Sequence, residues 1–325
     1  MKQAYLLGLT CLPLYSSKFS RQDFTQPQLF ACLVVREHQK KSYRGVEALL
    51  ADCPEWLADV GLSRAPDHNT LCRASRVILK PSRLDGMLDV TAEWGRRLGL
   101  IKGRVMPVAL DSSMFESRHV SRHFERRCRQ SAKAARRRAA GAAARSAQNA
   151  AKRDRKRARR EADLRRSRVA KRLPKLSPAV ATASHLILAA RATTGSGGDQ
   201  PFFAPLLRDA RRRASFDTAV GDAGFDSEDN HRISREEVGV RSVIPPNTGR
   251  PTDKAPTTRY RRLMKQRFAR KADKAKYGQR WQAETVNSMI KRNLGSALRA
   301  TDARRRSREL LLRVLTHNVM IVARL

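Results

Sequence analysis

Apolar residues recur at intervals of three and four between residues 28 and 60, which is the pattern of amphipathic helices. Gly61 ends this pattern. The recurring residues are Leu29, Cys32, Leu33, Val34, Val46, Leu49, Leu50, Trp56, Leu57 and Val60. The first part of the chain is therefore expected to be helical.

A further helix follows Pro66, with Asp67 or Asn69 as its cap and Pro81 beyond its end. The helices predicted in this region cover residues 44–52, 54–60 and 68–79. Such a set suits a small bundle of the helix-turn-helix kind that binds DNA. An ordinary helical packing domain accounts for the pattern equally well. We assign residues 1–100 to an N-terminal helical domain that binds DNA ends or mediates dimerisation.

After residue 100 the pattern changes to short apolar runs bounded by glycine and proline, which is typical of buried strands. One run ends at Asp111 and another runs into Gly221 and Asp222. The strands predicted here cover residues 105–110, 177–182, 184–190, 216–220 and 238–244, with a helix over 201–213. This order of elements predicts an α/β domain over residues 101–325.

Two helices are expected at the end of the chain, over residues 277–294 and 305–323. On the first, four polar residues fall within a stripe of about 60°: Tyr277, Arg280, Glu284 and Lys291. The opposite side is apolar and suits packing on a core: Ala283, Val286, Met289 and Ile290. Periodicity alone favours a solvated face with a Glu284–Arg280 pair, so the stripe by itself does not establish a site.

Charge changes this picture. The chain has 325 residues, of which 41% are hydrophobic, so it can bury a core. Its 68 Lys and Arg against 30 Asp and Glu give a formal net charge of +38, which attracts polyanions such as nucleic acid. An arginine-rich genome is the alternative explanation, and the distribution of the charge tests it.

Residues 118–175 hold 23 Lys or Arg and four acids, and 23 − 4 gives +19, half of the total. Composition bias alone would not concentrate charge in this way. The segment is mostly Ala and Arg, which favour helix, but it has few large apolar residues to pack. We expect a basic insertion that is a solvated or partly disordered helix ordering on DNA, or a plain flexible insertion.

The five cysteines are an odd number without a C-x-x-C pair, so they indicate neither a disulfide framework nor a zinc site. A reducing, cytoplasmic location fits this usage. The apolar run over residues 4–14 is short and interrupted, and we expect an ordered N-terminal segment rather than a secretory signal. No run approaches the ~20 apolar residues that span a bilayer, so no membrane partner is expected.

Two aspartates at the ends of neighbouring strands and a glutamate on a following helix are what two-metal phosphodiester chemistry requires. Asp111, Asp222 and Glu284 occupy these places. Carboxylate oxygens are ligands that Mg²⁺ or Mn²⁺ prefers, and two such ions ~3.5–4 Å apart activate the attacking oxygen and stabilise the leaving one. Each acid alone is a weak signal, because an aspartate at these positions also serves as a turn or cap residue.

The spacing Tyr277-x2-Arg280-x3-Glu284-x6-Lys291 resembles the Y-(2)-R-(3)-E-(6)-K signature of bacterial insertion-sequence transposases of the DDE type, in the insertion-sequence-four and -five group. The strand ending at Asp111 and the Gly-Asp-Ala-Gly-Phe-Asp-Ser block around Asp222 are similar to the family's other motifs. The resemblance covers most of residues 104–325. It reaches more loosely to residues 66–73.

The resemblance implies a ribonuclease-H-like catalytic core with a mixed sheet, in which Asp111, Asp222 and Glu284 hold two Mg²⁺ or Mn²⁺ ions. It implies that three residues of the stripe contact the DNA backbone near the scissile phosphate: Tyr277, Arg280 and Lys291. It also implies a homodimer that pairs terminal inverted repeats of double-stranded DNA and joins them to target DNA in the bacterial nucleoid. The long basic insertion departs from a compact version of this fold.

Trp281 lies beside the stripe at about 40°, where it could stack on an unpaired base. Packing is the more frequent use of a tryptophan. For the whole chain, the favoured reading is a transposase that cuts and rejoins DNA. The alternatives are a metal-dependent nuclease without strand transfer and a basic DNA-binding protein without catalysis.

Overall fold

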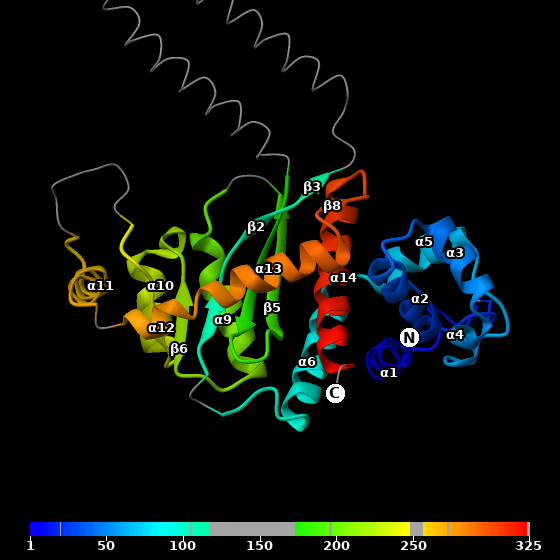
Figure 1. Ribbon diagram of the computed structural model, residues 1–325, viewed down its shortest axis with the longest axis horizontal. Coiled ribbons are helices and arrows are strands. Elements are labelled where there is room, and N and C mark those ends of the chain that lie inside the picture. Colours follow the sequence, from blue (N-terminus) through cyan, green and yellow to red (C-terminus); the bar gives the residue numbers. More distant parts are fainter. Residues whose placement is uncertain are drawn as a thin grey trace, which may run out of the picture.

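The computed structural model describes residues 1–19, 21–103, 106–117, 173–194, 197–247, 256–271 and 273–323. The predicted basic insertion over residues 118–175 lies outside this part of the chain, apart from its last three residues. The described residues form a group of N-terminal helices followed by a mixed α/β arrangement (Figure 1).

Five helices open the chain, in blue and light blue in Figure 1: α1 (Lys2–Cys11), α2 (Gln26–His38), α3 (Tyr43–Asp52), α4 (Pro54–Ala58) and α5 (His68–Ile78). The three helices predicted over residues 44–79 are confirmed. Polar side chains cap two of them, since the Ser42 hydroxyl accepts from the Gly45 N–H at the start of α3 and the Asp67 carboxylate accepts from the N–H groups of Asn69 and Thr70 at the start of α5. Thr25 and Gln28 form a reciprocal capping box at the start of α2.

The central sheet has the strand order β2-β4-β1-β6-β7, and β5 also pairs with β4. β1 is parallel to β6 and β6 to β7, whereas β4 is antiparallel to β1 and β5, so the sheet is mixed. The strands are β1 (Val108–Leu110), β2 (Ser113–Met114), β4 (Pro174–Ala181), β5 (Ile187–Thr194), β6 (Thr218–Gly221) and β7 (Arg241–Val243). Outside this sheet, β3 (Glu116–Ser117) pairs with β8 (Ala297–Leu298).

Alternate residues of the strands face two different layers of helices, as the pleat requires. Ala109 of β1 belongs to the core shared with α13 (Trp281–Leu294) and α14 (Ala303–Val322). Its neighbours Val108 and Leu110 belong to the core shared with α9 (Gln200–Arg213). The sheet therefore lies between α9 on one face and α13 with α14 on the other, and α13 crosses in front of it in Figure 1.

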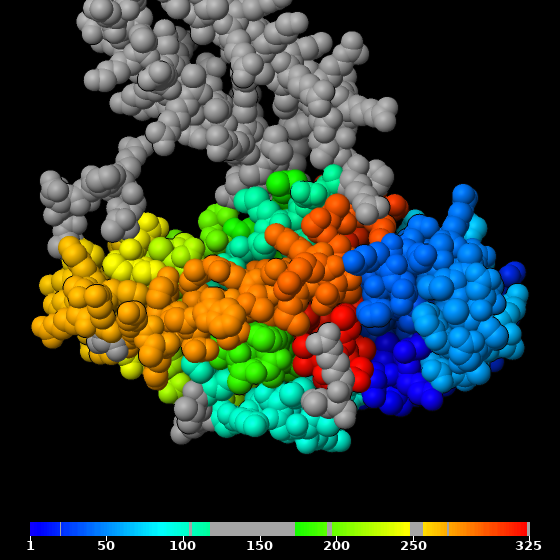
Figure 2. All heavy atoms as spheres, in the orientation of Figure 1, coloured from blue at the N-terminus to red at the C-terminus, as the bar shows by residue number. Residues whose placement is uncertain are grey.

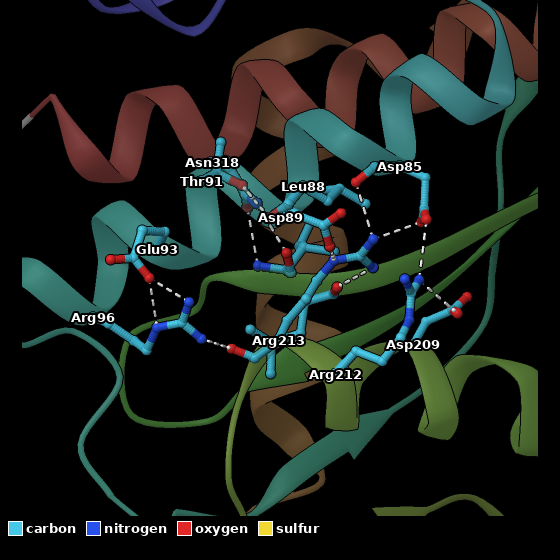
Figure 3. A network of polar contacts seen from close by, with 12 residues as sticks. Asp85, Leu88, Asp89, Thr91, Glu93, Arg96, Asp209, Arg212, Arg213 and Asn318 are labelled. Atoms are coloured by element: carbon cyan, nitrogen blue, oxygen red, sulfur yellow. Dashed lines mark hydrogen bonds and ion pairs between the residues drawn. The ribbon is translucent and has the colours of Figure 1, made fainter. Parts of the chain in front are cut away.

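A buried arginine ties helix α6 (Pro81–Arg97) to α9 and the sheet. Arg213, whose side chain is only 1% exposed, contacts Asp85 Oδ1 at 2.6 Å and Asp89 Oδ1 at 2.7 Å. It also donates to the carbonyl oxygen of Leu188 in β5 at 2.9 Å. Figure 3 shows both aspartates pointing from α6 toward this guanidinium. These contacts satisfy the buried Arg213 guanidinium and hold α6 in position against the sheet.

The predicted strands differ from the observed ones in their limits, most clearly at β5 and β7. β5 begins at Ile187 rather than at residue 184, because residues 182–184 form a turn and His185 takes a positive φ of 62°. β7 covers only three residues of the predicted 238–244. The chain before it is helical in α10 (Glu228–Arg232) and in a π-helical turn (Ile233–Glu237), and it turns at Gly239 with φ 69°.

The prediction of one continuous helix over residues 277–294 is wrong. The structure has α12 (Lys274–Gly278), then a break, then α13 beginning at Trp281. Gly278 is a poor helix former and ends the first piece. Tyr277 and Arg280 nevertheless remain adjacent, because the Arg280 N–H donates to the Tyr277 carbonyl at 2.9 Å.

Within the described part of the chain, no helix combines the length and the apolar character that a membrane crossing needs.

Candidate active site

The first two acids of the predicted site leave adjacent parallel strands at the same edge of the sheet. Leu110 of β1 lies opposite Gly221 of β6 in the register, so Asp111 and Asp222 follow side by side. Neighbouring strands are about 4.8 Å apart, which places both carboxylates at one edge. An added Cβ at Gly221 would lie 3.1 Å from the Phe225 ring, so a larger residue there would require the ring to shift.

Helix α13 brings the third acid to this edge. The Asn287 side-chain amide donates to Asp111 Oδ2 at 3.1 Å, and Glu284 precedes Asn287 by three residues on the same side of the helix. The Glu284 carboxylate is close enough to Asp111 to influence its titration. The structure therefore places Asp111, Asp222 and Glu284, which are far apart in the sequence, in the same region at the ends of β1 and β6.

The surroundings of Asp111 disfavour an uncompensated negative charge on its carboxyl group. Burial raises the pKa of the Asp111 carboxyl above its usual value, and the Glu284 carboxylate acts in the same direction. The Ser112 N–H, the Asn287 amide and the Arg280 guanidinium act in the opposite direction. A bound cation would relieve the remaining cost of ionising Asp111.

Two basic residues flank the acids. Arg280 Nη1 lies 2.6 Å from Glu284 Oε1, and its guanidinium lies 5.9 Å from the centre of the Tyr277 ring. Lys291 Nζ is 2.7 Å from the Ser113 hydroxyl, one residue beyond Ser112. The four residues of the predicted stripe thus lie along α12 and α13 beside the sheet edge. The break at Gly278 leaves this grouping intact.

Trp281 is 54% exposed next to this stripe. Its side chain is therefore not packed in the core, although packing is the more frequent use of a tryptophan. An exposed indole beside basic residues is available to a ligand.

One comparison with known proteins identifies the family. A family model described as the transposase DDE domain matches residues 109–319, about two thirds of the chain. The chain belongs to this transposase family. No curated protein matches the chain. The mixed sheet with its covering helices is consistent with the ribonuclease-H-like architecture of such domains, and DDE domains generally use divalent metal ions.

The transposase match spans all three acids, and their donor atoms suit a hard divalent cation. Carboxylate oxygens come from Asp111, Asp222 and Glu284. Among the described residues, however, no three His, Cys, Asp or Glu side chains stand close enough together to hold one ion. Glu284 is 52% exposed and paired with Arg280. It would exchange this partner for a metal.

Asn287 is a residue of the candidate site that the sequence interpretation missed. It is 4% exposed, and its Oδ1 is buried with no hydrogen-bond partner in the described part of the molecule. A buried oxygen without a donor is costly, and a metal ion or a metal-bound water would satisfy it. The signal available in the sequence was its position, three residues after Glu284 between the apolar Val286 and Ile290.

Proposed function

We propose that this protein is a DNA transposase that cuts and rejoins the ends of a mobile element, with Asp111, Asp222 and Glu284 as the ligands of two Mg²⁺ or Mn²⁺ ions. The observation that carries the proposal is the parallel register of β1 and β6, which sets Asp111 beside Asp222, together with α13, which adds Glu284. A transposase DDE domain over the same residues supports it.

In this proposal water attacks a phosphodiester bond at the element's end, and the freed 3′-hydroxyl then attacks target DNA. The two bound ions would activate the attacking oxygen and stabilise the leaving oxygen. Asp111, Asp222 and Glu284 bind and orient them. Asn287 holds the Asp111 carboxylate in its orientation through the amide contact.

The residues around the three acids would bind the DNA. Arg280 and Lys291 bind backbone phosphates, and Tyr277 adds a further backbone contact. Trp281, exposed beside them, stacks on an unpaired base. We further propose that the chain is of the insertion-sequence-four and -five type, a proposal that the spacing of these residues supports.

Further parts of the proposal concern the whole chain. Residues 1–100 would recognise the inverted repeats and mediate dimerisation, residues 101–325 would catalyse the reaction, and residues 118–175 would bind DNA through charge. The partners are double-stranded DNA and a second copy of the chain, because two ends must be paired before they are joined.

A cleavage assay separates this function from its alternatives. The full chain is incubated with Mg²⁺ and DNA that carries the flanking inverted repeats, and with EDTA as the control. Cutting at the repeats followed by joining to target DNA is expected. Cutting without joining would identify a metal-dependent nuclease, and binding without cutting would identify a DNA-binding protein without catalysis.

Arg280→Ala and Lys291→Ala should each weaken DNA binding and cleavage, because each removes one phosphate contact. We expect the slope of log affinity against log salt concentration to fall by about 1 for each variant. Arg97→Ala is the matched control, since Arg97 pairs with Glu93 on α6 and has no contact with the stripe. Unchanged slopes and cleavage rates in both variants would show that the stripe is a solvated helix face without a role in DNA binding.

Asn287→Ala should lower the affinity for Mn²⁺ and the cleavage rate by about 10- to 100-fold, the usual effect of losing a residue that orients a metal ligand. Mn²⁺ binding measured by calorimetry reports the affinity independently of activity. Asn293→Ala, on the same helix but without a contact to Asp111, is the control. Wild-type Mn²⁺ affinity in Asn287→Ala would remove Asn287 from the site.

A further inference from the structure

A cavity of about 300 Å³ lies between the N-terminal helices and the start of α14, away from the three acids. Its walls come from α2, α3, α5 and the segment from residue 299 to 312. Five arginines line it: Arg36, Arg76, Arg299, Arg305 and Arg308. Glu309 is the one acid among the described residues that line it.

The ion-pair partner of the Glu309 carboxylate is Arg313, which is not one of the five arginines that line the cavity. Its carboxylate accepts hydrogen bonds from Arg313 Nη2 at 3.0 Å and from the backbone N–H groups of Arg299 and Ala300 at 3.0 and 2.9 Å. It therefore holds the wall in place rather than neutralising the side chains that face the cavity.

Two of the lining arginines have charge to offer a ligand, whereas Arg36 is paired with Glu37 at 2.8 Å and Arg305 with Asp302 at 3.0 Å. Arg76 and Arg308 form no ion pair with any described residue, and both are accessible to solvent. Arg36 is 6% exposed and stacks 4.1 Å from the Tyr43 ring centre. Its Nε is buried without a hydrogen-bond partner in the described part of the chain. An anion is the ligand that satisfies a buried guanidinium donor.

Two helix starts add to the positive potential. Ser42 and Tyr43 lie at the beginning of α3, and Thr301 lies just before α14; all three line the cavity. Side chains cap one N–H group in each first turn, since Ser42 accepts from the Gly45 N–H and Asp302 from the Arg305 N–H. The remaining N–H groups carry part of the positive end of the helix dipole. Anions bind readily at such ends.

The cavity is also joined structurally to the candidate active site. Lys40, at the end of α2, donates through Nζ to the Arg292 carbonyl at the end of α13 at 2.8 Å, and its own carbonyl accepts from Arg299. In Figure 2 the N-terminal helices lie directly beside the end of α13 on one face. A single extended polyanion could therefore reach both places.

We propose that this cavity binds a backbone phosphate of the same DNA duplex whose end enters the active site. The N-terminal helices and the catalytic domain would then grip one duplex, which fixes the distance between the recognised sequence and the cut. The inference rests on the proposed DNA transposase function and adds to it a second phosphate site.

Cys72 lines the cavity and provides a direct probe, while Cys53 is partly exposed but lies outside it. The full chain is labelled with iodoacetamide, with and without a short duplex that ends in the inverted repeat, and labelling is followed peptide by peptide. With DNA at ten times its Kd, Cys72 should react about tenfold more slowly. Cys53 should react at an unchanged rate.

A pair of double variants provides the second arm. Arg76→Ala with Arg308→Ala should lower the salt slope of binding by about 1, because one phosphate contact is lost. Arg73→Ala with Arg304→Ala is the control, because it removes the same charge from α5 and α14 at positions that do not line the cavity. It should change the salt slope less. If DNA binds but Cys72 stays unprotected, or if the two double variants behave alike, the cavity is not a phosphate site. Absence of any DNA binding by the wild-type chain would instead overturn the proposed function.

Discussion

Replacing Asp111 or Asp222 by Asn, or Glu284 by Gln, should abolish Mg²⁺-dependent DNA cleavage while leaving DNA affinity nearly unchanged. Each substitution keeps the size of the side chain and removes one negative charge from the proposed metal site. Metal ions contribute several kcal/mol to stabilising the transition state, which corresponds to a loss of at least about 1,000-fold in rate. The expected backbone contacts belong to other residues, so binding should persist.

The measurement is cleavage of DNA bearing the inverted repeats, with affinity measured in parallel. Asp229→Asn is the control, because Asp229 is an exposed acid close to Asp222 in the sequence but on α10. We expect it to cut DNA at the wild-type rate. Robust Mg²⁺-dependent cutting by any one of the three variants would exclude that residue from the site.

Arg313→Ala should lower the free energy of unfolding by about 3–5 kcal/mol, which is the cost of leaving a buried charge without its partner. Arg313 is fully buried in α14 and lies 3.2 Å from Glu37 Oε2 and 3.0 Å from Glu309 Oε1. It also donates to the carbonyls of Gly295 and Ala297 at 2.6 and 3.0 Å. Its loss would leave Arg36, 2.8 Å away, as the remaining ion-pair partner of the buried Glu37 carboxyl, whose pKa burial raises.

Urea unfolding of the full chain measures this effect. Arg305→Ala is the control, because Arg305 pairs with Asp302 at 3.0 Å on the surface of the same helix and such pairs contribute about 0–1 kcal/mol. If Arg313→Ala were as stable as Arg305→Ala, the buried network would not hold α2 against α14.

The strands that carry Asp111 and Asp222 could be predicted because each is a short apolar run that stops at an acid. Burial on both faces demands such a run, so the signal lies within a few residues. The amphipathic pattern of α13 likewise predicted which side packs on the sheet. The local sequence pattern was sufficient wherever the residues of a segment themselves determine whether it forms a helix or a strand.

Contacts between distant segments could not be predicted in this way. Asn287 meets Asp111 across 176 positions of sequence, and a single polar residue on a helix gives no sign of its partner. The five arginines around the cavity come from α2, α5 and the segment beginning at residue 299, and they do not stand out in an arginine-rich chain. Only the packing of α14 on α2 brings them together.

The break after Gly278 illustrates a different limit. A single Gly278 lowers helix stability by about 1 kcal/mol, which tertiary contacts can outweigh in either direction. Here the chain turns through Gly278 to Arg280 and restarts as α13. The sequence pattern was continuous across this point, and the helix was not.

The central claim is that Asp111, Asp222 and Glu284 share one metal centre, and iron-directed cleavage of the protein tests it most directly. Fe²⁺ replaces Mg²⁺ in the full chain, and ascorbate with hydrogen peroxide generates radicals that cut the polypeptide beside the bound ion. The account predicts three cuts, next to Asp111, Asp222 and Glu284, that disappear together with excess Mg²⁺ and in the Asp111→Asn variant. Cuts beside only one of these residues, or at unrelated acids, would contradict it.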